Sequence, residues 1–182
     1  MTLRLITAPA SATVATATAK AFLRIDHTSD DTLIETLVKA ASEKGEALAR
    51  RAFITQTLEQ TFDEWPSDYL LTVLRPRLQS VTSVKYLDEN ADEFTWTDYA
   101  VDAKSEPGKI IFNSFPSVDL LDSGGITVRF VAGYGASESA IPERIKQAVL
   151  QLVAYWYEAR GAGFDVPKPI REMFTAERAV WF

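Results

Sequence analysis

The sequence predicts an α+β fold: a helical core, built from two long helices plus short N- and C-terminal helices, with an inserted antiparallel β-sheet. Apolar residues recur at helical spacing in residues 31–50 and again in residues 142–160. Between these segments, bulky and polar side chains alternate in short runs separated by turn residues, which is typical of half-buried strands. A group of strands between helices indicates an α+β arrangement.

We expect a single domain, because 182 residues can bury one sizeable core. Changes of period and composition along the chain divide this domain into four parts. The expected parts of domain 1–182 are an N-terminal arm with helices (1–53), an antiparallel β insertion (54–132), a long central helix (136–160) and a C-terminal segment (164–182).

The N-terminal part should hold two helices. Residues 1–12 indicate an extended or loosely ordered arm, and residues 13–25 a weak helix, because threonine has a mediocre helix propensity. The second helix, at about residues 31–50, has apolar residues on one half and charged residues on the other. Asp30 is a suitable N-cap, and Asp31 adds negative charge at the positive end of the helix dipole.

The central part should form short antiparallel strands. Leu58, Gln60 and Phe62 alternate with polar neighbours, and a Glu-Pro-Gly turn at 106–108 predicts a hairpin. The expected strands are 54–65, 69–74, 81–87, 94–96, 99–101, 109–112 and 126–135.

The helix predicted at residues 143–159 is unusually apolar. Most of its strongly polar residues fall within an arc of about 60°, whereas a helix on the surface of a monomer needs only an apolar stripe of about 100°. Such a helix is enclosed either by the rest of the chain or by a neighbouring subunit. Glycines at 161 and 163 should end it, before a last short helix at 170–179. The pattern favours a structural protein that assembles.

Composition excludes several function classes. The chain has no cysteine and one histidine, which excludes disulfides, cysteine nucleophiles and histidine-rich zinc sites. A net charge of -6 argues against tight sequence-independent binding of DNA. No run of 18 apolar residues is present for a membrane span, and the N-terminus has no secretory h-region. We expect a soluble protein made in a cytoplasm.

No group of residues predicts an enzyme. His27 lies among capping residues, and the acidic turn at 88–93 lacks the spacing of a calcium loop, so a solvated hairpin turn is the better interpretation. Gly133 and Gly135 follow a strand and precede a helix, but no phosphate-binding motif is completed around them. We expect no catalytic residue, no cofactor and no metal.

Two groups of residues are candidates for protein–protein contacts. Arg50 and Arg51 fit salt bridges at a subunit boundary better than a DNA-binding patch, because the rest of the chain is acidic. Tyr155, Trp156 and Tyr157 are consecutive on a helix and point in three directions, so at least one should face a partner or a second layer.

The order of several segments resembles the head-tail connector (adaptor, head completion) family of tailed double-stranded DNA bacteriophages and gene transfer agents. The similarity covers nearly the whole chain. Its segments are Ala-Phe-Leu-Arg-Ile-Asp at 21–26, Leu-Ile-Glu-Thr-Leu-Val-Lys-Ala-Ala at 33–41, the series from 74 to 86, Val-Arg-Phe-Val-Ala-Gly-Tyr-Gly at 128–135, 141–158 and the terminal Arg-x-x-Trp-Phe.

This resemblance implies a ring-forming structural subunit, usually in twelve copies, at the virion neck. Such a ring sits under the portal protein, joins capsid to tail and continues the DNA channel toward the next neck or tail component, a stopper or head-closure protein. Double-stranded DNA would pass without sequence-specific binding, with no membrane involved. Before assembly the subunit would be in the host cytoplasm. A negatively charged lumen would disfavour lasting phosphate contacts.

The resemblance also assigns expected roles to residues. The candidates for the subunit interface are Arg50, Arg51, Tyr155, Trp156 and Tyr157. The candidates for portal docking are Arg171, Phe174, Arg178, Trp181 and Phe182.

Two alternative functions stay open at this point. One is a head-closure or tail-terminator protein of the neck. The other is a small metal- or nucleotide-dependent enzyme, suggested only by the glycines at 133 and 135 and by scattered carboxylates.

Overall fold

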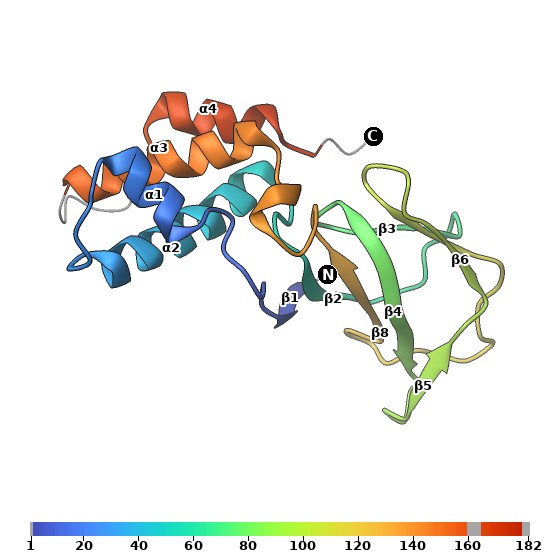
Figure 1. The fold of residues 1–182 in the computed structure, drawn as a ribbon. Coiled ribbons are helices and arrows are strands. Elements are labelled where there is room, and N and C mark those ends of the chain that lie inside the picture. The colour runs from blue at the N-terminus through green and yellow to red at the C-terminus, as the bar shows by residue number, and fades with distance from the viewer. Residues whose placement is uncertain (1, 160–164, 180–182) are drawn as a thin grey trace. The chain divides into compact units, whose positions relative to one another are not determined.

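A computed structural model describes residues 2–159 and 165–179, which form two compact units (Figure 1). The helical unit comprises residues 9–54 and 134–179, and the sheet unit takes residues 2–8 and 55–133. Each unit therefore draws on segments that are far apart in the sequence.

The described part of the helical unit contains four α-helices and a short 3₁₀ turn. They are α1 (Thr16–Leu23), α2 (Asp31–Ala49), η1 (Glu138–Ala140), α3 (Glu143–Ala159) and α4 (Lys168–Ala176). Helix α2 ends at Ala49. The next residue, Arg50, adopts the left-handed conformation with φ 52°, and its backbone N–H donates a hydrogen bond to the carbonyl of Glu46.

The core of the helical unit lies between α2, α3 and α4. Along α2 the buried residues recur at helical spacing, among them Ile34, Val38 and Ala41. Gly45 is also on this face, and a Cβ there would lie 2.5 Å from Cε1 of Phe174 and 2.9 Å from Cε2 of Phe53. The absence of a side chain at Gly45 lets these two rings pack against α2.

The apolar helix α3 is enclosed mainly by its own chain. It packs against α1, α2 and α4, and its buried residues are Ile145, Ala148, Val149, Leu150, Leu152, Val153 and Trp156. Of the two arrangements left open by the sequence, enclosure by the rest of the chain therefore accounts for most of this helix. Among the large hydrophobic side chains of α3, Tyr155 is the exposed one, with 43% of its surface open to solvent.

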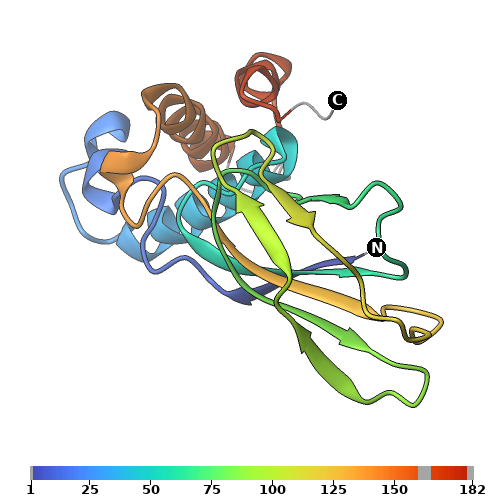
Figure 2. The ribbon, with the colours of Figure 1, turned by 90° about the vertical axis from the view of Figure 1, so that its right-hand side faces the viewer.

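The larger sheet of the sheet unit is antiparallel throughout. Its strands are β1 (Thr2–Thr7), β2 (Gln56–Phe62), β8 (Ile126–Ala132), β4 (Leu78–Leu87) and β5 (Glu93–Trp96), in that spatial order. In Figure 2, β8 (gold) lies between β2 (teal) and β4 (green). Residues from the two ends of the sequence-predicted insertion thus pair directly.

Alternation along β8 determines which face of this sheet is buried. Ile126, Val128, Phe130 and Ala132 are buried, and the residues between them are half-buried. Gln60 of β2 lies on the same face and is fully buried; its Oε1 accepts a hydrogen bond from the backbone N–H of Leu74 at 2.9 Å. That hydrogen bond satisfies a polar group in an otherwise apolar layer.

The smaller sheet consists of β3 (Leu70–Thr72), β7 (Lys109–Phe112) and β6 (Tyr99–Asp102), again antiparallel. An aromatic cluster packs within the same unit. Trp65 is central to it, with ring centroids 5.3 Å from Phe112, 5.0 Å from Phe115 and 6.0 Å from Tyr86.

The fold class expected from the sequence was wrong in its details. The described residues form a mixed α+β fold with two antiparallel sheets, not a helical core that carries one inserted sheet. The N-terminal arm is a strand of the larger sheet, so that sheet is not confined to residues 54–132. Strand pairing between distant segments, which short-range periodicity does not report, caused the difference.

Candidate assembly surfaces

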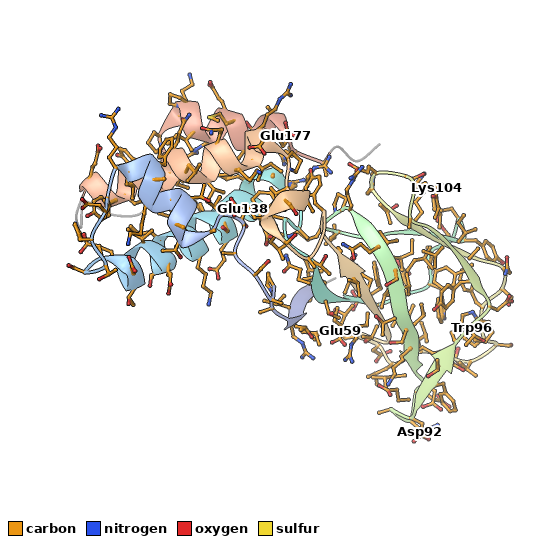
Figure 3. All side chains as sticks on the ribbon, in the orientation of Figure 1. Glu59, Asp92, Trp96, Lys104, Glu138 and Glu177 are labelled. Carbon is orange, nitrogen blue, oxygen red and sulfur yellow. The ribbon has the colours of Figure 1, made fainter. Side chains whose placement is uncertain are left out.

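A groove runs between α3 and α4 on the helical unit. It has a volume of about 470 Å³ and is lined by Glu143, Arg144, Gln147, Gln151, Met173, Ala176 and Glu177. Arg144 and Glu177 form an ion pair of 3.6 Å between the two helices, and Figure 3 labels Glu177 at the end of α4. Tyr155 lies four residues beyond Gln151 on the same face of α3, so an exposed aromatic ring continues this row.

The predicted portal-docking residues are in different environments. Arg171 and Arg178 are exposed on α4 and just after it, and Arg171 lies 3.8 Å from the carboxylate of Asp165. Phe174 is fully buried and stacks on Phe53, with ring centroids 6.3 Å apart. Trp181 and Phe182 lie outside the described residues. Among the described candidates for portal docking, only Arg171 and Arg178 are exposed and could contact another protein.

The two arginines after α2 have different surroundings. Arg50 is exposed, whereas Arg51 is half-buried and its Nε donates to the backbone carbonyl of Glu177 at 2.6 Å. Arg51 therefore stabilises the end of α4 within its own unit. Arg50 is the better placed of the two to meet another molecule.

The three aromatic residues of α3 also separate. Trp156 is buried, and its indole N–H donates to the carbonyl of Asp165 at 2.8 Å. The hydroxyl of Tyr157 donates to the carboxylate of Asp30, which ties the end of α3 to the start of α2. Tyr155 remains as the exposed candidate for a contact surface.

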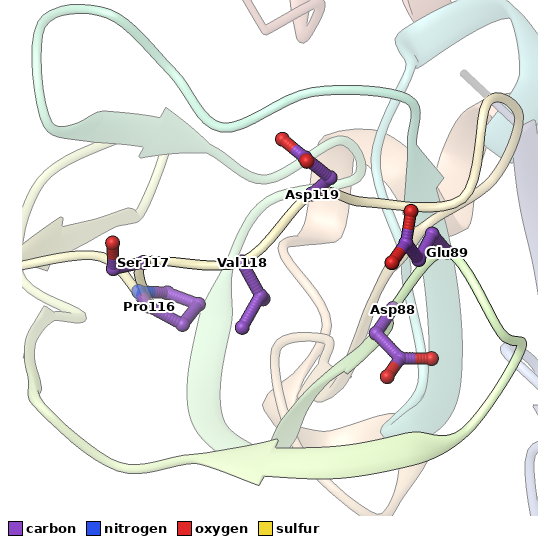
Figure 4. A pocket seen from close by; sticks show the side chains of 6 residues that line it. All are labelled: Asp88, Glu89, Pro116, Ser117, Val118 and Asp119. Carbon is purple, nitrogen blue, oxygen red and sulfur yellow. The ribbon is translucent and has the colours of Figure 1, made fainter.

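The acidic turn of the sheet unit borders a shallow pocket of about 580 Å³ (Figure 4). Residues 116–119 form one side, and Asp88 and Glu89 form the other. The Asp88 carboxylate accepts hydrogen bonds from the backbone N–H groups of Asn90 at 3.0 Å and Asp92 at 2.9 Å, as in a tight turn. Within the described ranges, no group of three His, Cys, Asp or Glu side chains is arranged to hold a metal ion.

A second turn, at residues 102–105, depends on a carboxylate. The Ser105 hydroxyl donates to Asp102 Oδ2 at 2.5 Å, and the N–H groups of Ser105 and Lys104 donate to Oδ1 at 3.1 and 2.9 Å. These bonds, the hydroxyl first, hold the pKa of Asp102 below its ordinary value.

We expect Asp102→Asn to lower the stability of the protein at neutral pH but to have less effect in acid. A carboxyl whose pKa is depressed in the folded state contributes stability above its unfolded pKa of about 3.9, and this contribution is lost as the pH falls through the folded pKa. Denaturant midpoints of both proteins at pH values above and below about 4 test this. Ser105→Ala should show part of the effect, and a constant difference across that range would contradict the assignment.

An ion network around one buried carboxylate crosses three strands of the larger sheet and was not predicted from the sequence. Glu59 of β2 is labelled in Figure 3 and is only 8% exposed. Its Oε1 accepts from Arg4 of β1 at 3.0 Å, and its Oε2 accepts from Arg129 of β8 at 2.7 and 3.1 Å. The opposite charges at 4, 59 and 129 are visible in the sequence, but only the strand register aligns them.

Comparison with protein-family models decides the family. The model described as head completion protein matches residues 13–164, which is most of the chain. The chain belongs to the head completion protein family. This confirms the resemblance seen in the sequence. A comparison with curated protein sequences finds no match.

Solved structures share the fold of this head completion protein over its whole length. A chain in the neck of an empty GTA particle, computed with C6 symmetry, has a TM-score of 0.83 and 23% identity. A chain in the virion of a native gene transfer agent particle has a TM-score of 0.84, also at 23% identity. Each alignment covers 100% of this chain and 97% of the other. A third, in a native GTA neck computed with C12 symmetry, has a TM-score of 0.77 and 22% identity.

The described helices do not have the features of membrane-spanning helices. None within residues 2–159 and 165–179 combines the length and apolar character that crossing a bilayer requires.

Proposed function

We propose that the chain is a head-tail connector subunit that forms a ring, of twelve copies, at the neck of a phage or gene-transfer-agent particle. The observation that carries this proposal is the full-length similarity to chains from GTA necks, together with membership of the head completion protein family. The C6 and C12 symmetries of the two neck structures support a cyclic assembly. In this role the protein acts through its shape and its contacts.

The ring would bind the portal protein on one side and the next neck component, a stopper or head-closure protein, on the other. Double-stranded DNA would pass through its lumen. At -6 per chain, twelve copies carry on the order of seventy negative charges, which disfavours lasting contacts with phosphate. This acidity supports a passage for DNA more than a binding site for it.

Two surfaces of the helical unit are proposed for these contacts. Arg171 and Arg178 are exposed and basic, and we assign them to the portal. Arg50, at the C-cap of α2, and Tyr155, in the C-terminal part of α3, are exposed and are assigned to the subunit interface. The buried Phe174 and Trp156 would support these surfaces from beneath rather than touch a partner.

Omission of the chain from an otherwise complete particle system tests the function. We expect heads that package DNA but carry no tails and lose their DNA, since the channel under the portal would lack its continuation. Supplying the wild-type chain should restore tailed, infectious or gene-transferring particles. Normal tailed particles without the chain would contradict the proposed role.

The same system tests the portal surface. The double variant Arg171→Glu and Arg178→Glu should fold normally but fail to restore tailed particles or to bind isolated portal rings. Lys39→Glu with Lys44→Glu is a matched control, because both lysines are exposed on α2 and the charge change is identical. Equal portal binding by both double variants would reject the assignment of the two arginines. Deleting the whole of α4 is unsuitable, because Ile170 and Phe174 belong to the core.

A further inference from the structure

The first strand of the larger sheet is held with little apolar burial. Strand β1 pairs with β2 in an antiparallel register that places Thr2 opposite Thr61 and Leu5 opposite Leu58. No residue of β1 is buried, and Leu5 is 51% exposed. Most of the attachment is therefore backbone hydrogen bonding, which an identical strand from another copy reproduces bond for bond.

The side-chain contacts of β1 specify which strand can occupy this edge. Arg4 Nη2 lies 3.0 Å from Glu59 Oε1, and the backbone N–H of Thr2 donates to Oγ1 of Thr61 at 3.2 Å. Glu59 also retains Arg129 as an ion-pair partner on its other oxygen, so it keeps a counter-charge when β1 is absent. The edge of β2 thus prefers an extended segment with a cation opposite Glu59, which this chain itself supplies.

The connection after β1 can act as a hinge. Residues 7–12 are all exposed and include Pro9, and the chain passes there from the sheet unit to the helical unit. The next fixed points belong to the helical unit: Ser11 Oγ donates to the carbonyl of Ala136 at 2.7 Å, and Thr13 and Val14 are buried. Between Thr7, the end of β1, and Ser11, the first fixed point, lie residues 8–10, and three extended residues span about 10 Å.

We propose that β1 is exchanged between neighbouring copies, so that Thr2–Thr7 of one copy completes the larger sheet of the next. Each copy has one such strand to donate and one β2 edge to receive it. In a ring, each copy would donate its strand to one neighbour and receive a strand from the other, which is a head-to-tail contact. Head-to-tail contacts close into rings when the rotation between copies allows it, and exchange of an identical element is a low-cost route to assembly. This inference rests on the proposed ring and names one of the contacts that hold it together.

Cysteine cross-linking tests the exchange cleanly, because the chain has no cysteine of its own. Two full-length variants, Thr2→Cys and Thr61→Cys, are co-expressed as separate chains in the particle system and oxidised after purification. Position 2 lies opposite position 61 in the β1–β2 register. In this mixture a disulfide at that register forms only when β1 of one copy pairs with β2 of another. We expect a shift from the mass of one chain to that of two on a non-reducing gel.

Two controls fix the interpretation. A single chain carrying both cysteines should oxidise in every case, which shows that the two positions are in bonding register. Thr2→Cys mixed with Asp92→Cys should give no dimer, because β2 and β8 separate β1 from the exposed turn that holds Asp92.

The outcomes separate this inference from the function on which it rests. Particles that contain both variants at the neck without the dimer reject the exchange and leave the proposed function in place. Absence of the chain from the neck rejects the proposed function and the exchange together. A dimer that appears in particles but not with the control pair supports the exchange.

Discussion

Replacing Phe174 with alanine should lower the free energy of unfolding of the helical unit by about 3–5 kcal/mol. Phe174 is fully buried, stacks on Phe53, and packs against the bare backbone at Gly45. Of these two neighbours, Gly45 has no side chain that could move into the space, and Phe53 is itself fully buried. The cavity term therefore adds to the lost transfer free energy. Denaturant unfolding followed by far-UV circular dichroism, which reports mainly on helices, measures the change.

Met173→Ala in the same helix is the matched control for this prediction. Met173 is only partly buried and borders the groove between α3 and α4, so its truncation should cost clearly less than that of Phe174. Similar small losses for the two variants would show that Phe174 is not the anchor of α4. In that case its expected role as a contact with another protein would regain support.

The burial of Phe174 shows what helical periodicity can establish. Ile170 and Phe174 are four residues apart, which predicts one apolar face, and the structure has that face buried. Periodicity does not say what covers the face. From the sequence, Phe174 is a candidate for portal docking, and in the structure it packs on Phe53 and against Gly45 of the same chain.

The helices were easier to predict than the sheets because their signals are local. The expected range 31–50 for α2 differs from the observed Asp31–Ala49 by one residue at its end. For α3, the apolar pattern at 143–159 matches the observed Glu143–Ala159, but the part assigned to this helix, 136–160, starts seven residues too early and includes the 3₁₀ turn η1. Strand β1 was expected as an extended or loosely ordered arm, since its edge position leaves no buried face to impose alternation. Its partner lies more than fifty residues away, and the pairing becomes visible only in the register.

For the candidate surfaces too, features with a local signal could be predicted from the sequence and features that depend on distant segments could not. Of the three consecutive aromatic residues, Tyr155 is the exposed one, because a helix turns about 100° per residue. That at least one of them faces a partner or a second layer stays a prediction. Arg51 could not be distinguished from Arg50 by sequence, since only the folded chain brings the carbonyl of Glu177 to Arg51. The ion network around Glu59 depends on two strand pairings at once and has no local signal.

The second large effect is expected when Glu59 loses both of its arginines. Arg4→Met alone should cost under about 1 kcal/mol, because Arg4 is 72% exposed at the sheet edge and Arg129 remains. Arg129→Met should cost about 1–2 kcal/mol, since that arginine is 42% exposed and Arg4 remains. The double variant leaves a buried carboxylate without a counter-charge, which costs about 3–5 kcal/mol, more than the two single changes together.

A double-mutant cycle followed by a third substitution separates the charge effect from lost packing. Chemical denaturation of the four proteins gives the coupling between the two arginines, which share one acceptor and are therefore not additive. Adding Glu59→Gln to the double variant should recover most of the lost stability, because a neutral amide of the same shape is less costly to bury than an unpaired charge. Additive single effects, or no recovery with glutamine, would mean that the arginines stabilise the sheet through their aliphatic stems, and not through the carboxylate that they share.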